Sequence, residues 1–128
     1  MQNKESFIPD DWFKNAKKDL ERVKLRLEEE DLEEAAVHLQ QALEKYLKGY
    51  LLSKGWHLKK IHDLAALLAE AIKYNPELEK FMEFCQEVSA YYFEDRYPFF
   101  AEGPSGEEIK VALLKAEELV REIMQFQK

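Results

Sequence analysis

The feature that most constrains the fold of this chain is the recurrence of apolar residues at steps of three and four along four long stretches. This spacing places apolar side chains on one face of an α-helix, whereas a half-buried strand would need strict alternation. Only four glycines and four prolines occur, which leaves few turns and suits long helices better than many strands. The sequence therefore predicts an all-α protein.

Helix start and stop signals divide the chain into five helices. Asp31 is followed three residues later by Glu34, which is the spacing of a capping box. The same spacing recurs at Ser105 and Glu108. Gly55 is the expected end of the second helix, and the fourth helix is expected to stop before a proline. The five expected starts are Pro9 or Asp10, Asp31, His62-Asp63, Asn75-Pro76 and Ser105.

The expected architecture is an up-and-down antiparallel helical bundle of four long helices plus one short helix, the third. A chain of 128 residues has the usual size of one domain, and a hydrophobic content of 46% is enough to bury a core. No linker, repeat or low-complexity stretch interrupts the helical pattern. Residues 1–128 are therefore expected to form a single domain.

The charge distribution excludes one broad class of function and leaves a local question open. The net charge of −7 opposes general binding to nucleic-acid backbones, so no DNA partner is expected. Residues 43–62 nevertheless contain five lysines and one acid, which gives this stretch a charge of +4. The stretch is either a region that attracts an anion or a helix end whose lysines complement the helix dipole.

Neither a disulfide nor a membrane segment is expected. Cys85 is the only cysteine, which fits an intracellular, reducing environment. No apolar run approaches the roughly 20 residues that span a bilayer, and the first residues lack the apolar stretch of a signal peptide. We therefore expect a soluble, cytoplasmic protein with no membrane partner.

The usual motifs of enzymes built on helical bundles are missing from the sequence. Di-iron bundles use paired Glu-x-x-His motifs, and none occurs here. His57 and His62 lack clustered cysteine or carboxylate ligands, and there is no glycine-rich phosphate loop. Cys85 lies on an apolar helical face, which is typical of a core thiol rather than a nucleophile. We expect no metal and no cofactor.

One polar group of residues stands out on the second expected helix. Gln41, Glu44 and Lys48 follow one another at i, i+3 and i+7, and Lys45 is adjacent to this row. Residues at this spacing share one helical face. Glu44, Lys45 and Lys48 lie within the locally basic stretch, so this face is a candidate for an anion site.

The end of the fourth expected helix is unusually aromatic, with six aromatic residues among residues 91–100. Ser89, Tyr92 and Arg96 share one face there, and arginine binds phosphate through two hydrogen bonds while aromatic rings stack on bases. Alternatively, the rings form a hydrophobic end of the bundle or a dimer contact, with Arg96 paired to a carboxylate. Because so many rings are difficult for a small monomer to bury, we expect a homodimer with this segment in or near the contact.

Four groups of residues, in this order, resemble the HEPN family, the helical domain named for higher eukaryotes and prokaryotes nucleotide-binding. The resemblance covers nearly the whole chain and is specific through the combination of its parts. The four groups are Trp12, Ala16 and Asp19-Leu20; Gln41-Ala42, Glu44-Lys45 and Leu47-Lys48; His62-Asp63-Leu64; and Asp95-Arg96-Tyr97-Pro98.

The resemblance implies an antiparallel bundle of four or five helices and one of three roles. Members of the family accompany a minimal nucleotidyltransferase, cut RNA as toxins without a metal, or bind nucleotides. The RNA-cutting members use an arginine followed four to six residues later by a histidine. Arg96 matches that arginine, but the partner positions Ala101, Glu102 and Gly103 hold no histidine. Without that side chain no obvious acid or base is available for cleavage.

We therefore predict a non-catalytic HEPN-type helical protein without catalytic residues of its own. We expect it to bind a nucleotide or to serve as the partner of a minimal nucleotidyltransferase in a toxin–antitoxin-like pair. The alternatives are a metal-independent ribonuclease toxin and a pure protein-interaction or antitoxin module.

The expected site is one polar pocket that accepts a phosphate-bearing ligand. Glu44 is expected to hold a lysine or the arginine in place, and Tyr92 or Tyr97 to stack on a base. Alternatively, nearby carboxylates neutralise the cations as solvated ion pairs of little consequence. The cationic residues expected to line the pocket are Arg96, Lys45, Lys48 and His62.

Overall fold

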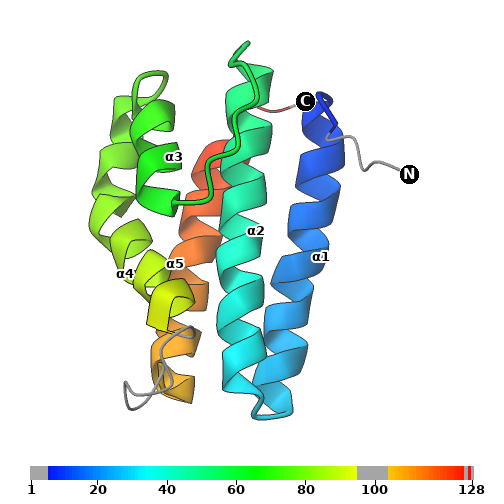
Figure 1. Ribbon diagram of the computed structural model, residues 1–128, viewed down its shortest axis with the longest axis vertical. Helices are drawn as coiled ribbons and strands as arrows, with labels where there is room; N and C mark the ends of the chain where they lie inside the picture. The colour runs from blue at the N-terminus through cyan, green and yellow to red at the C-terminus, as the bar shows by residue number, and fades with distance from the viewer. Residues whose placement is uncertain (1–5, 95–103, 126, 128) are drawn as a thin grey trace.

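Helices make up most of the part of the chain that the computed structural model describes, residues 6–94, 104–125 and 127 (Figure 1). Within these ranges no β-strand occurs, so the all-α prediction is confirmed. None of the helices described is both long and apolar enough to cross a lipid bilayer. The helices are α1 (Pro9–Glu28), α2 (Leu32–Ser53), α3 (Leu64–Ile72), the 3₁₀-helix η1 (Pro76–Phe81), α4 (Met82–Glu94) and α5 (Gly106–Met124).

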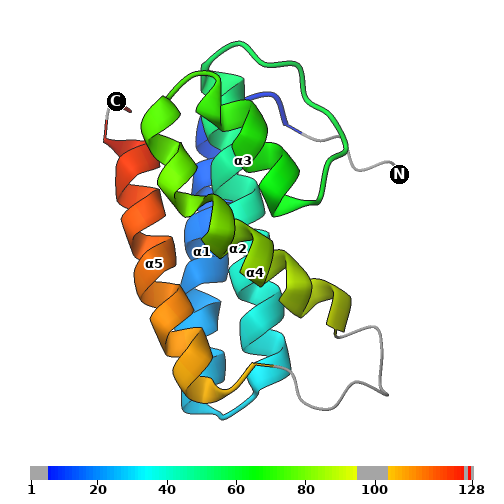
Figure 2. The same ribbon diagram turned by 90° about the vertical axis from the view of Figure 1, so that its left-hand side faces the viewer.

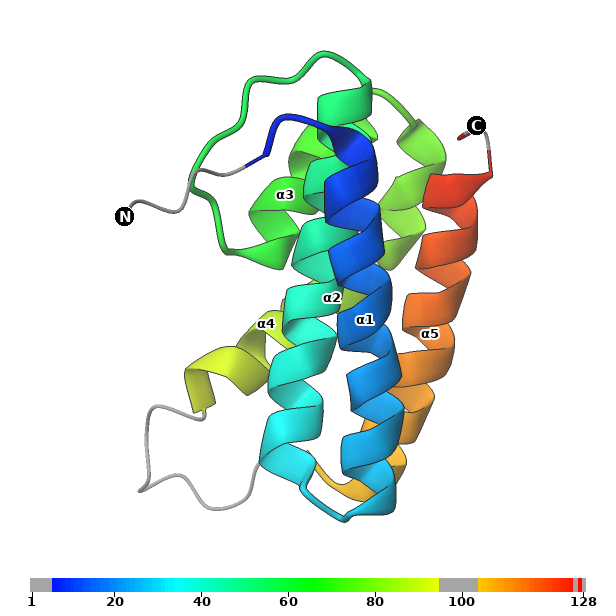
Figure 3. The same ribbon diagram turned by 90° about the vertical axis from the view of Figure 1, so that its right-hand side faces the viewer.

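α1 and α2 form a closely packed antiparallel pair, as their short connection predicted (Figures 1 and 3). Gly49 of α2 lies against the ring of Phe13 of α1, and a Cβ at this position would come within 2.7 Å of that ring. Glycine therefore sets how closely the two helices approach. This contact fixes which side chains of α1 and α2 face one another further along the pair.

α2 is the central helix of the bundle, and it packs against α1, α3, α4 and α5. Its buried face is lined by leucines spaced four residues apart, at positions 39, 43, 47 and 51. Each leucine of this kind contributes roughly 1.5–3 kcal/mol through burial, before the entropy cost of ordering it. The polar residues described below lie on the same helix, so this apolar face holds them in place.

Two details differ from the expected up-and-down bundle. α1, α2, α4 and α5 alternate in direction, but α3 runs in the same direction as α2, because the extended segment 54–63 carries the chain back along the bundle (Figures 1 and 2). Buried Trp56 fixes this segment, since its indole N–H donates to Glu70 of α3 at 3.1 Å. In addition, the fourth helical stretch begins as η1, so α4 itself starts at Met82.

The side-chain caps follow the helix starts that the sequence predicted. Asp63 Oδ1 accepts the backbone N–H of Ala65 at 3.0 Å at the start of α3. Ser105 and Glu108 form a complete capping box at the start of α5, with distances of 3.1 and 3.0 Å. Gly55, just beyond α2, has a φ of 87°, a conformation that glycine adopts without strain. Asp31 and Asn75 cap α2 and η1 through backbone N–H groups in the same way.

Candidate functional site

Three charged or titratable side chains meet where α2 passes the segment before α3. Glu44 Oε2 accepts a hydrogen bond from Lys48 Nζ at 3.1 Å and contacts His62 Nδ1 at 2.9 Å. Because an ionised carboxylate only accepts, the histidine Nδ1 carries the hydrogen in this contact. We call Glu44, Lys48 and His62 the Glu44 cluster.

The members of the Glu44 cluster differ sharply in their access to solvent. The Lys48 side chain is 1% exposed, whereas the His62 side chain is 67% exposed. The Lys48 ammonium also lies 5.6 Å from the centre of the Trp12 ring of α1, and the Trp12 indole N–H donates to the Ser6 carbonyl at 2.8 Å. Lys48 is thus an internal counter-ion for Glu44, held between a carboxylate and an aromatic face. His62 is the member that a ligand can reach.

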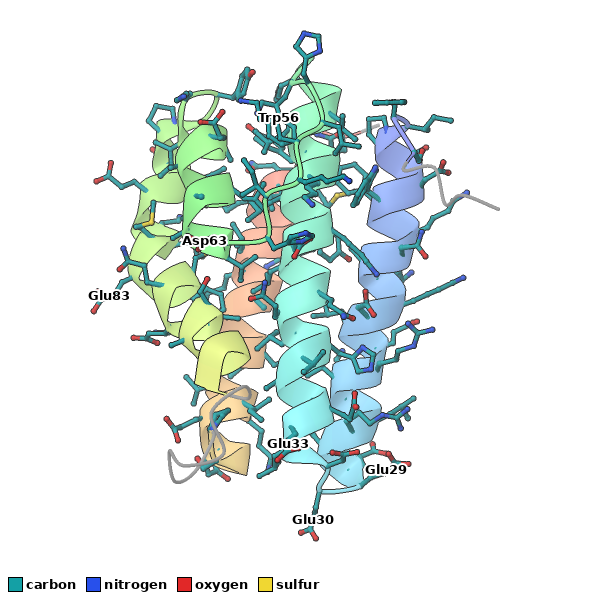
Figure 4. The ribbon with its side chains drawn as sticks, viewed as in Figure 1. Glu29, Glu30, Glu33, Trp56, Asp63 and Glu83 are labelled. Atoms are coloured by element: carbon teal, nitrogen blue, oxygen red, sulfur yellow. The ribbon has the colours of Figure 1, made fainter. Side chains whose placement is uncertain are left out.

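Polar side chains from α2 and α4 support the backbone around His62. The Gln40 amide, on a side chain that is almost completely buried, donates to the His62 carbonyl at 3.0 Å, and Ser89 Oγ of α4 donates to Asp63 Oδ1 at 3.2 Å. Asp63 lies at the point where the chain enters α3 (Figure 4). The Gln40 Oε1 atom is buried and has no hydrogen-bond partner among the residues described. The central helix α2, the segment 54–63, the start of α3 and helix α4 therefore meet at residues 62 and 63.

A second polar cluster lies between α1 and α2, and it contains Lys45. Asp19 is buried, and its Oδ2 lies 2.6 Å from Lys45 Nζ. Its Oδ1 lies 3.2 Å from both Arg22 Nη1 and His38 Nδ1. Among the described residues Lys45 therefore pairs with Asp19 of α1, whereas Lys48 pairs with Glu44, so the two lysines expected to line one pocket belong to two different clusters. The physical reason is that residues 44 and 45 face different neighbours on a helix.

The predicted site residues are thus only partly brought together. Glu44 holds a lysine, as expected, and His62 lies beside it. The pair of Glu44 with Lys48 is buried, which excludes the alternative of a solvated surface pair for these two residues. Arg96 and Tyr97 lie outside the described residues, as does the side chain of Tyr92 and most of the aromatic segment 91–100.

Sequence reasoning missed Gln40 and Asp19 as structural partners of the site residues. Gln40 precedes Glu44 by one helical turn and follows directly after Leu39. A polar residue beside the apolar face of the helix was the sequence signal that could have pointed to it. Asp19 stood among the residues of the family resemblance, but its burial depends on the packing of α1 against α2. Both are polar side chains held inside the bundle, where an unpaired group would be costly.

Two kinds of chemistry find no support in the part of the molecule described. Burial raises the pKa of the Cys85 thiol to about 12, with a smaller contribution from the charge of Asp63, so this cysteine is a poor nucleophile. No group of three or more His, Cys, Asp or Glu side chains suited to a metal ion occurs among the described residues. The reactive group with the best access in the described cluster is the imidazole of His62.

Fold and site together define an all-α protein with a polar cluster built on its central helix. The chain belongs to the HEPN family, because the family model for the HEPN domain matches residues 9–126. Membership of this family indicates a nucleotide-binding or ribonuclease-type function. No curated protein and no solved structure matches the chain significantly.

Proposed function

We propose that this chain is a non-catalytic HEPN protein that binds a nucleotide through its phosphate groups, as the helical partner of a minimal nucleotidyltransferase. One observation carries the nucleotide site: His62 is an exposed imidazole whose Nδ1 is held at 2.9 Å by Glu44. Glu44 is itself held by a buried lysine, so the orientation of the ring is set before any ligand arrives.

In its protonated form, His62 has two N–H donors. One of them stays on Glu44, and the Nε2–H is then available for a phosphate oxygen in a charge-assisted hydrogen bond. Because Lys48 already balances the charge of Glu44, the cluster with a protonated histidine carries a net positive charge that attracts an anion. We assign a second phosphate contact to Arg96, and base stacking to Tyr92 or Tyr97.

The sequence supports a binding role over a catalytic one. The positions after Arg96 that hold the histidine of RNA-cutting relatives are Ala101, Glu102 and Gly103. None of these side chains transfers a proton in the way that a histidine does near neutral pH. A protein of this kind contributes binding surface, and its nucleotidyltransferase partner supplies the chemistry.

Isothermal titration calorimetry with ATP tests the nucleotide site. We expect His62→Ala and Arg96→Ala each to weaken binding about tenfold, the loss of one charge-assisted hydrogen bond. His57→Ala is the matched control, because it removes another exposed histidine of the same segment and should leave the affinity unchanged. No binding of ATP or another nucleotide at millimolar concentration, with or without a nucleotidyltransferase partner, would refute the proposal.

The contact between Glu44 and His62 also favours one second candidate function, metal-independent RNA cleavage. A carboxylate that holds Nδ1–H leaves Nε2 of the same ring as a general base or acid. His62 then replaces the histidine that is missing after Arg96. The purified chain should be incubated with single-stranded RNA in the presence of a chelator: we expect no cleavage, and cleavage abolished by both His62→Ala and Arg96→Ala would establish the ribonuclease instead.

A further inference from the structure

The negative charge of this protein is concentrated in its second part. Residues 76–128 contain twelve carboxylate side chains and six lysines or arginines, so six of the seven net negative charges fall there. Residues 1–75 are close to neutral. The acidity is therefore a property of the half that contains η1, α4 and α5, and not of the whole surface.

The lining residues of three neighbouring hollows define a groove between η1–α4 and α5. Figure 2 shows that α4 diverges from α5 towards the C-terminal end of α4. It consists of three hollows of about 370, 340 and 260 Å³. The first two share Phe81 and Glu118, and the last two share Phe84 and Lys115, so the hollows form one continuous groove. Along α5 it extends from residue 107 to residue 125, which corresponds to about 27 Å of helix.

The groove has two phenylalanines in its floor and a rim of net negative charge, in which six glutamates outnumber the three cations Lys80, Lys115 and Arg121. Buried rings of Phe81 and Phe84 form part of the lining, and Val111 at the edge is 52% exposed. Leu114, one turn beyond Val111 on α5, is 62% exposed, so two large apolar side chains stand uncovered next to each other. The rim carries exposed carboxylates that form no ion pair with any described residue, at Glu83, Glu87 and Glu118 (Glu83 is labelled in Figure 4).

We propose that this groove is a docking site for a basic amphipathic helix of a partner protein. An apolar stripe on such a helix covers the phenylalanine floor and the uncovered Val111 and Leu114, while its lysines and arginines face the carboxylates of the rim. The length of the groove matches about five helical turns. This surface is formed by other elements than the Glu44 cluster, and the inference does not depend on nucleotide binding.

The charges of the chain itself argue against the other occupants. A nucleic acid is repelled by the acidic rim. A second copy offers exposed cations in the segment 54–63 and along α1, at Lys14, Lys17, Lys18, Arg22 and Lys24. The apolar face of α1 is packed against α2 in the bundle, however, so α1 has no free apolar stripe to cover the phenylalanine floor, and the lysines of the segment 54–63 do not lie on a helix. Docking that segment into the groove of a neighbour would be a head-to-tail contact, which extends into open chains unless the geometry closes. A helix from a different protein satisfies both the shape and the charge of the groove.

The probe is a fluorescein-labelled peptide of about 18 residues, with leucines at i, i+3, i+4 and i+7 spacing and lysines or arginines on both flanks. Its binding is followed by fluorescence anisotropy with the full chain at low and at moderate salt. The test variant is the triple charge reversal Glu83→Lys, Glu87→Lys and Glu118→Lys. The matched control reverses three exposed carboxylates at the α1–α2 turn, Glu28, Glu30 and Glu33. Circular dichroism and urea midpoints show whether both variants remain folded.

We expect the wild type and the control variant to bind the peptide alike, and the groove variant to bind at least tenfold more weakly. Val111→Asp should weaken binding as well, since it places a charge on the apolar edge. Equal losses of affinity in both triple variants would show that the peptide is held by general charge attraction, and would overturn the proposal. A wild type that does not bind the peptide at about 100 µM would overturn it as well. If the wild type forms oligomers that only the groove variant disrupts, the occupant is a second copy and the proposal is wrong. ATP binding by the groove variant, measured by calorimetry, tests the nucleotide site separately.

Discussion

The buried pair of Glu44 and Lys48 makes a quantitative prediction about stability. Replacing Lys48 with methionine keeps the shape of the side chain but removes the ammonium group that faces Glu44 and Trp12. Removing one partner of a fully buried ion pair costs about 3–5 kcal/mol, because the other charge stays behind without compensation. Glu44 is 15% exposed and retains His62, so we expect the free energy of unfolding to fall by about 2 kcal/mol.

The reciprocal change should cost more, because Lys48 is more deeply buried than Glu44. Glu44→Leu removes the carboxylate partner of the ammonium group and leaves the Trp12 ring as its neighbour among the described residues, so we expect a loss of about 3 kcal/mol. The double variant Glu44→Leu, Lys48→Met contains no buried charge at this position. Because apolar replacement of a whole buried pair is often close to neutral, we expect the double variant to lose only about 1 kcal/mol.

Urea denaturation followed by circular dichroism measures these losses, provided that the slope with denaturant is unchanged. Lys110→Met is the matched control, since the pair of Lys110 with Glu107 is exposed and 3.6 Å long, and its loss should be too small to resolve. Additive single losses, with a double variant near 5 kcal/mol, would show that the two charges do not compensate one another and would refute the reasoning.

Three further predictions concern packing, capping and pH. Gly49→Ala should lower the free energy of unfolding by about 1–3 kcal/mol, because the new Cβ would come within 2.7 Å of the Phe13 ring; urea denaturation measures the loss, and a variant as stable as the wild type would contradict it. Ser105→Ala should cost about 1 kcal/mol by the same assay, and Ser105→Gly only a few tenths. Stability should fall as the pH rises above about 9, because burial raises the pKa of Cys85 to about 12 and also raises the pKa of Tyr46, so both groups ionise first in the unfolded chain. A urea midpoint that does not fall between pH 8 and pH 10.5 would contradict this last prediction.

The positions of the helices could be predicted because their signals are local. The capping box at Ser105 and the cap at Asp63 depend on residues within one turn, and both form as the sequence indicated. The direction of α3 could not be predicted in this way. It depends on the path of the segment 54–63, which is fixed by the contact of Trp56 with Glu70, and the two residues of that contact lie 14 positions apart.

The site was predictable to the extent that it lies on one helix. Glu44 and Lys48 are four residues apart, so their contact follows from helical geometry alone. The pairing of Lys45 with Asp19 depends instead on the register of α1 against α2, which the approach at Gly49 helps to fix. A single sequence gives the face of a helix on which a residue lies, but not the residue of the neighbouring helix that meets it.

Charge balance explains why Lys48, which is buried, is part of the proposed nucleotide site. Without Lys48, a protonated His62 and the Glu44 carboxylate would cancel, and the cluster would offer no net attraction to a phosphate. With Lys48 the three side chains carry a net charge of about +1 when His62 is protonated, and this charge lies at the exposed imidazole. Lys48 therefore acts through Glu44, as a positioning residue and a counter-ion. On this reasoning Lys48→Met lowers nucleotide affinity as well as stability. The double variant recovers stability and the net charge of about +1, but it lacks the carboxylate that orients His62 Nδ1, so we expect it to recover only part of the affinity. A double variant that binds ATP as tightly as the wild type would separate the buried pair from the proposed site.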